Sequence, residues 1–235
     1  MRGPIVDNPR MLKTPDWHPV VPAHLLGAGQ RLLATRVLGQ DLVAWRSTDG
    51  VAQIWRDRCP HRGVRLSLGR ILGGRLSCAY HGWEFAPDTG RCEAIPALAD
   101  LARLPGQTHA SVCETAESGQ MVWVRLAAGT AASVTPPPGA SLPAPVPGRF
   151  LRSFAIGTCR EALHACLHQR DFQPDGPAAW TGAMAGQAVR MFLQATQDDQ
   201  VIVHAWTDEL PATKHHAGLF AALRRLRSDA ESAIG

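Results

Sequence analysis

The sequence contains almost no lysine: Lys13 and Lys214 are the only two among 235 residues, so scattered arginines carry nearly all of the positive charge. The net charge of +4 therefore comes without a run of basic residues, and this gives little support to nucleic-acid binding. The arginines are most simply interpreted as a solvated surface. A docking face for an acidic partner is compatible with the same residues.

Long apolar runs are missing as well. The first twenty residues contain Pro4, Asp7, Pro9 and Asp16, and they never accumulate the apolar stretch of a secretory signal. No segment approaches the roughly 18 apolar residues that a transmembrane helix needs. We therefore expect a cytoplasmic protein that does not cross a membrane. In such a chain the six cysteines are better interpreted as ligands and buried thiols than as a disulfide framework.

The composition, with 45% apolar and 19% charged residues, is that of a chain able to bury a core. Alternating apolar and polar residues predict strands in the first half, and the Ala-, Gly-, Ser-, Thr- and Pro-rich stretch 128–148 predicts a linker. We predict an α+β protein: an antiparallel β domain over 15–127, followed by an α+β domain over 149–235. The expected strands are 31–38, 42–47, 51–57, 75–81, 121–126, 149–156, 189–196 and 201–207, and the expected helices are 160–170 and 219–233.

Two short segments combine thiol and imidazole side chains: RCPHRG at 58–63 and SCAYHGW at 77–83. A Rieske-type [2Fe–2S] centre needs two cysteines on one iron and two neutral histidines on the other, and the histidines raise its reduction potential. The four candidate ligands are Cys59, His61, Cys78 and His81. A Cys₂His₂ zinc site in an interaction module uses the same ligand types, but zinc fingers pair two cysteines and two histidines separately.

Three segments carry a family resemblance: WHPV (17–20), RDRCPHRGVRLSLGR (56–70) and SCAYHGWEFAPDTGRCEAIP (77–96). They resemble the N-terminal half of the Rieske non-haem iron oxygenases, the ring-hydroxylating and demethylating family. Respiratory-chain Rieske proteins carry an extra cysteine in each loop, where this chain has Val64 and Tyr80. The resemblance implies a reductase or ferredoxin as electron donor, a mononuclear Fe(II), O₂ and a small organic substrate such as an aromatic compound. It also implies assembly into a homotrimer.

A second candidate site lies in the second half, where Glu161, His164 and His168 fall at i, i+3 and i+7 of an expected helix and share one face. A non-haem Fe(II) oxygenase needs two histidines and one carboxylate around its iron. By resemblance, His164, His168 and Asp229 would be the iron ligands, and Glu161 would relay between the two metal centres.

This second match departs from the family pattern. The family segment is Asp-x-x-His-x-x-x-x-His, whereas here Glu161 replaces the aspartate and the second histidine comes one residue early. Only sixty residues separate His168 from Asp229, which indicates a shortened catalytic domain. Two alternatives therefore stay open: helix-face histidines with a surface aspartate, and an electron carrier or degenerate paralogue without mononuclear iron.

Overall fold

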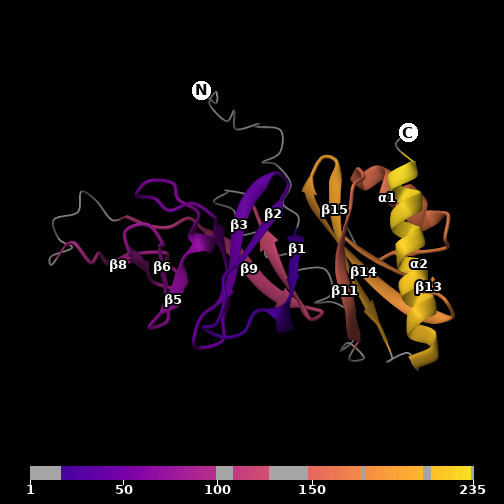
Figure 1. The fold of residues 1–235 in the computed structure, drawn as a ribbon, viewed down its shortest axis with the longest axis horizontal. Helices are drawn as coiled ribbons and strands as arrows, with labels where there is room; N and C mark the ends of the chain where they lie inside the picture. Colours follow the sequence, from indigo (N-terminus) through magenta and orange to yellow (C-terminus); the bar gives the residue numbers. More distant parts are fainter. Residues whose placement is uncertain (1–16, 99–107, 127–147, 176–177, 209–212, 234–235) are drawn as a thin grey trace.

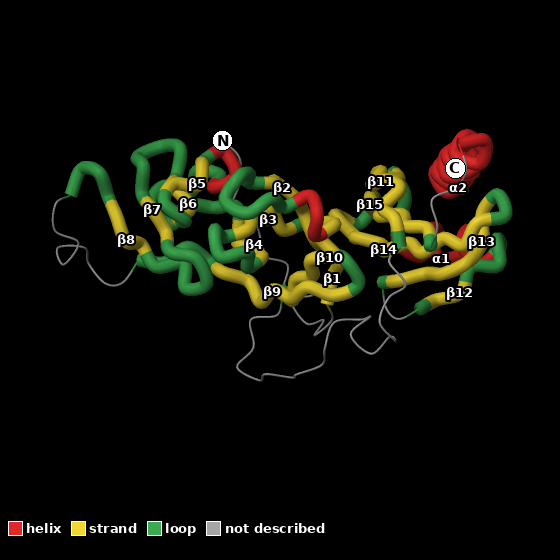
Figure 2. The backbone as a smooth tube through the Cα atoms, turned by 90° about the horizontal axis from the view of Figure 1, so that it is seen from below, coloured by secondary structure: helices red, strands yellow, loops and turns green. Residues whose placement is uncertain are grey.

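The computed structural model describes residues 17–98, 108–126, 148–175, 178–208 and 213–233. Three antiparallel sheets and two α-helices make up this part of the chain, which confirms the predicted α+β class. The sheets follow one another along the long axis, with the smallest at one end and helix α2 at the other (Figures 1 and 2). The expected linker, apart from Gly148, lies outside the described residues.

The largest sheet has buried strands at its centre, because both of its faces are covered. Val43 and Trp45 pack into one hydrophobic cluster, while Leu42 and Ala44, pointing the other way, pack into another. A tight turn at Gly50, with φ of +90°, joins two of these strands, as the Asp49-Gly50 pair predicts. In spatial order the strands are β1 (Trp17–Pro22), β10 (Met121–Arg125), β9 (Val112–Ser118), β4 (Ala52–Arg56), β3 (Gln40–Arg46) and β2 (Leu33–Val37).

The chain between β4 and β9 contains the smallest sheet and the two turns that carry the candidate metal ligands. The first ligand turn follows β4 and precedes the short 3₁₀ helix η2 (Leu66–Leu68). The second joins two neighbouring strands of the small sheet. In spatial order these strands are β5 (Arg70–Leu72), β6 (Arg75–Ser77), β7 (Glu84–Phe85) and β8 (Cys92–Ala94).

The third sheet belongs to the second half of the chain and buries one face under two helices. Met191 and Leu193 of its central strand share a core with Leu163 and Leu223 of the helices. The elements are β11 (Arg149–Ile156), β15 (Gln200–Thr207), β14 (Gln187–Gln197), β13 (Ala179–Met184), β12 (Gln173–Pro174), α1 (Arg160–His168) and α2 (Thr213–Ser232). No helix of the described part combines the length and the apolar character needed to cross a lipid bilayer.

The other face of the third sheet packs against the first half of the chain. Phe192 and Trp206 join Trp17 and Trp123 in one cluster, and the rings of Trp123 and Phe192 meet edge to face at 5.5 Å. Backbone hydrogen bonds cross the same interface, from the amide of Gly39 to the carbonyl of Thr196, for example (2.7 Å). The two halves are therefore joined by both apolar and backbone contacts.

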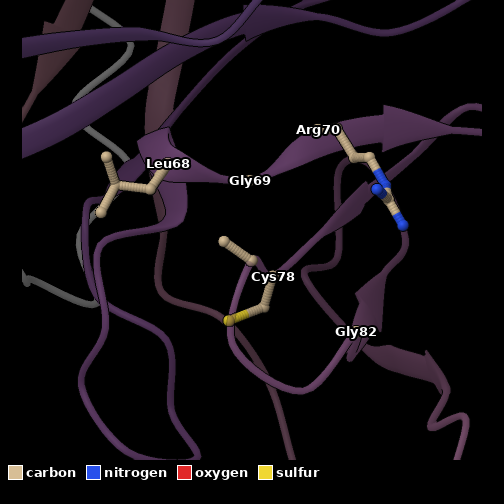
Figure 3. A pocket seen from close by; sticks show the side chains of 6 residues that line it. Leu68, Gly69, Arg70, Cys78 and Gly82 are labelled. Atoms are coloured by element: carbon tan, nitrogen blue, oxygen red, sulfur yellow. The ribbon is translucent and has the colours of Figure 1, made fainter.

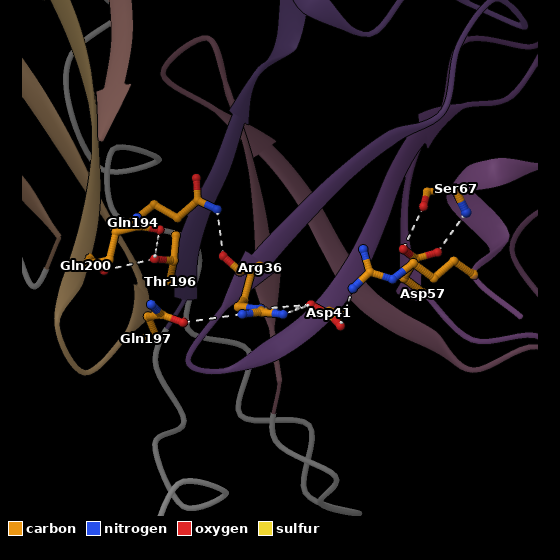
Figure 4. Close-up of polar contacts among 9 residues, drawn as sticks. Arg36, Asp41, Asp57, Ser67, Gln194, Thr196, Gln197 and Gln200 are labelled. Atoms are coloured by element: carbon orange, nitrogen blue, oxygen red, sulfur yellow. Dashed lines mark hydrogen bonds and ion pairs between the residues drawn. The ribbon is translucent and has the colours of Figure 1, made fainter. Parts of the chain in front are cut away.

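A buried polar chain crosses this interface as well, centred on His204. Gln194 donates from Nε2 to the Arg36 carbonyl (2.9 Å, Figure 4) and to Thr35 Oγ1 (2.8 Å). Its Oε1 is therefore left to accept from His204 Nε2 at 2.9 Å. His204 Nδ1 must then accept from the Ser153 hydroxyl at 2.7 Å. This arrangement fixes one neutral tautomer, and burial lowers the pKa of His204 to about 3.

Acid is therefore expected to destabilise the protein through His204. The unfolded imidazole has a pKa near 6.5 and the folded one about 3, so between these values the unfolded state binds more protons and the free energy of unfolding falls as the pH falls. At pH 5 the loss relative to pH 7.5 is about 2 kcal/mol. Urea unfolding at both pH values should show this extra loss in the wild type and not in His204→Gln; equal pH dependence in the two proteins would contradict it.

Candidate metal centre

The two ligand turns have the same backbone hydrogen-bond pattern. In the first, the Cys59 amide donates to the Val64 carbonyl (2.8 Å) and the Gly63 amide donates back to the Cys59 carbonyl (2.8 Å). In the second, Cys78 pairs likewise with the carbonyl of Trp83 (2.9 Å) and with the amide of Gly82 (3.1 Å). The glycine that closes each turn has a positive φ, +71° at Gly63 and +68° at Gly82, which few other residues adopt. The sequence thus builds two equivalent turns that each end in a glycine.

The turns bring the four candidate ligands together as two pairs. The Cys59 and Cys78 thiols are buried and close enough to hydrogen bond to each other. The His61 and His81 rings are exposed, and their Nδ1 atoms face each other at 3.2 Å. Burial, reinforced by Cys78, raises the pKa of Cys59 to about 11, so a metal would have to displace the thiol protons on binding. Desolvation lowers the pKa of His61, which favours the neutral imidazole that binds metals.

This separation into pairs fits a two-iron cluster better than a single ion. A tetrahedral zinc ion needs four donors around one point. Within the described ranges, no three His, Cys, Asp or Glu side chains converge on one metal position. A [2Fe–2S] cluster instead takes two thiolates at one iron and two imidazoles at the other. The donor set therefore fits the cluster, with its histidine end facing solvent.

Neighbouring side chains support this geometry. The Trp83 ring, from the second turn, stacks on His61 of the first, nearly parallel and with the ring centres 4.4 Å apart, and so covers one face of this imidazole. Buried Asp57 accepts from the amide (2.7 Å) and the hydroxyl (2.6 Å) of Ser67, and so ties the end of β4 to η2 (Figure 4). The sequence analysis did not identify Asp57 or Ser67, for which the only sequence signal is an aspartate two residues before a candidate ligand cysteine.

The other four cysteines take no part in the centre. The structure contains no disulfide among the described residues, which include all six cysteines. Cys92 is buried, and burial raises the pKa of half-buried Cys113 to about 11. Both agree with the interpretation as core thiols.

The second candidate site is only partly assembled. His164 and His168 lie on one face of α1, and both rings contact Trp180, at 5.0 and 4.7 Å between ring centres. The Nε2 atom of His164 is buried without a hydrogen-bond partner, and burial lowers the pKa of this histidine. Glu161, one turn earlier on α1, is exposed. These three side chains do not form a metal-ion site among the residues that the structure places.

Asp229 lies on the opposite side of α1 from the histidines. Its carboxylate forms an ion pair with Arg170, whose guanidinium also donates to the carbonyl (3.0 Å) and the sulfur (2.8 Å) of Cys166. Cys166 follows His164 by two residues, and two residues turn an α-helix by about 200°. The structure therefore does not bring Asp229 to His164 and His168, and their role as iron ligands stays a prediction.

A thiol pair and an imidazole pair on two matching turns are the donor set that an iron–sulfur centre of the Rieske type needs. The family model described as "Rieske [2Fe-2S] domain" matches residues 16–105. The chain thus carries a Rieske [2Fe–2S] domain, and a [2Fe–2S] cluster is the cofactor of this domain.

Curated relatives confirm the resemblance to the Rieske non-haem iron oxygenases. Oxidoreductase NdmD of Pseudomonas putida is 36% identical over 110 residues, which are 47% of this chain and 18% of the relative. Methylxanthine N1-demethylase NdmA of the same organism is 34% identical over 133 residues, 54% of this chain and 36% of the relative. This chain therefore spans well under half the length of either relative.

The fold is also that of a solved oxygenase. The structure of apo dicamba monooxygenase superimposes with a TM-score of 0.68 at 16% sequence identity, and the match covers 94% of this chain and 87% of that one. Since the match extends through almost the whole chain, the second half shares the oxygenase architecture as well as the first.

Proposed function

We propose that this protein is an electron-transfer oxidoreductase of the Rieske oxygenase type, reduced by a reductase or a ferredoxin. The observation that carries the proposal is the division of Cys59, Cys78, His61 and His81 into a buried thiol pair and an exposed imidazole pair. A bound [2Fe–2S] cluster supplies one-electron redox chemistry. The thiols anchor it inside the protein, and the two histidines form the edge at which electrons enter and leave.

A second candidate function is a complete oxygenase, in which the electrons reach a mononuclear Fe(II) and O₂ is used to hydroxylate or demethylate a small organic substrate. The unpartnered Nε2 atom of His164, one turn from His168, favours it, because such a pair can ligate a metal. Against it, Asp229 is held by Arg170 on the other side of α1. The donor set in the second half is therefore two imidazoles without a positioned carboxylate, and no reaction step is assigned to it.

Iron and sulfide analysis of anaerobically reconstituted protein separates these functions. We expect about two irons and two acid-labile sulfides per chain, and a reduced-state paramagnetic signal of mixed thiolate and imidazole ligation. If the protein is an electron carrier with two irons, the His164→Ala variant should keep all of its iron. About three irons, one of them lost in His164→Ala, would instead establish the oxygenase. A colourless protein that holds zinc would overturn both.

A further inference from the structure

The protein surface around the cluster end has positive charge that nothing in the described structure neutralises. Arg58, Arg62 and Arg70 are exposed, and within the described residues none of them has a carboxylate partner. Other arginines nearby are paired: Arg65 with Asp41 at 3.1 Å, and Arg75 with Glu93 at 2.8 Å. Unpaired positive charge is thus present in and directly after the first ligand turn, in the region where His61 and His81 are exposed.

A hollow adjoins this charged surface. It has a volume of about 210 Å³ and lies between the segment that joins η2 to β5 and the second ligand turn. Figure 3 shows the side chain of Arg70 extending beside the hollow toward Gly82, with Cys78 opposite Leu68. The hollow is lined by Leu68, Gly69, Arg70, Cys78, Ala79 and Gly82. Its one charged group is Arg70, and it has room for a carboxylate side chain with several waters.

Exposed apolar side chains flank the hollow. Leu68 is 67% exposed and Tyr80, in the second ligand turn, is 57% exposed. Aromatic residues and arginine are enriched in protein interfaces, where an apolar centre is surrounded by a polar rim. Leu68 and Tyr80 with the unpaired arginines provide both parts of such an interface.

We propose that the electron donor is an acidic redox protein that docks on this surface and places one of its carboxylates on Arg70 at the hollow. The inference rests on the proposed electron-transfer function and adds the place and the charge of the donor's contact. Complementary charge speeds encounter and fixes the orientation of the complex. One electron leaves the donor's reduced centre and reduces one iron of the cluster, and no covalent bond forms or breaks.

The test uses an acidic plant-type [2Fe–2S] ferredoxin, reduced beforehand, as the probe. Anaerobic stopped-flow mixing measures the rate of cluster reduction in the wild type, in Arg70→Glu and in Arg224→Glu. Arg224 is an exposed arginine of α2 without an ion pair in the described structure, so its substitution makes the same change in net charge far from the cluster. We expect Arg70→Glu to lower the rate roughly tenfold or more at low ionic strength, with the difference shrinking as salt is added.

Two measurements make the outcome decisive. Dithionite should reduce the cluster fully in every variant, and the midpoint potential of each variant allows rates to be compared at equal driving force. If the wild type is reduced and Arg70→Glu is slowed no more than Arg224→Glu, the docking surface is wrong while the electron-transfer function stands. If the ferredoxin cannot reduce an intact wild-type cluster at all, the electron-transfer function itself fails.

Discussion

Replacing Cys59 with serine is expected to abolish cluster binding. The side chain is 3% exposed and its thiol lies against that of Cys78, so the substitution removes one of only two sulfur donors without leaving a cavity. A serine hydroxyl does not ionise at neutral pH, so it does not replace the lost thiolate. The iron that needs two thiolate ligands would then have only the one from Cys78. The variant should fold but be colourless, with iron and labile sulfide near zero by chemical analysis.

Cys159→Ser is the matched control for this experiment. Cys159 precedes α1 at its N-cap, where it makes no side-chain capping hydrogen bond. Serine is a preferred capping residue, so this variant should keep the full cluster and gain roughly 0.5–1 kcal/mol of stability. Full iron and sulfide in Cys59→Ser would show that the four-ligand centre is wrong, whatever the behaviour of the control.

The ligand turns could be predicted from the sequence because their information is local. Each turn contains its own cysteine, histidine and closing glycine within a few residues, so the spacing alone predicts the two turns and their candidate donors. The same locality explains why α1, β11 and β15 were expected close to where they lie. In contrast, β1, β9 and β13 were not expected. For β1 the reason is that its only partner, β10, lies about a hundred residues away, and no local pattern encodes such a partner.

The second site shows the limit of the same reasoning. Helical periodicity correctly placed His164 and His168 on one face, because both belong to one short element. The position of Asp229 depends instead on how α2 packs against α1 and on its ion pair with Arg170. Arg170 lies 59 positions earlier in the chain. Likewise, the hydrogen bonds from Gln194 to Thr35 and Arg36 join residues nearly 160 positions apart. Tertiary packing decides such contacts, and one sequence does not reveal it.

Gly69→Ala is expected to destabilise the protein and loosen the cluster together. A Cβ atom at position 69 would lie 2.1 Å from the Ser77 carbonyl oxygen and 3.0 Å from that of Leu66. Both are backbone atoms, so a side chain cannot rotate away to make room, and β6 must shift immediately before Cys78. Forced overpacking of this kind costs up to about 3 kcal/mol. Calorimetry should show the lower unfolding temperature, and the rate of iron release to a chelator should rise.

The appropriate comparison is Gly157→Ala, because it adds the same methyl group where space exists. The nearest atom to that Cβ would be Glu231 Oε1 at 3.9 Å, and Gly157 does not have a positive φ. Its stability should change little or rise, since alanine restricts the unfolded chain. The cluster-release rate separates the two effects of Gly69→Ala: destabilisation with unchanged release would mean that Ser77 can move without disturbing Cys78. Because Ser77 and Cys78 share a peptide bond at the start of the ligand turn, we expect the two effects to appear together.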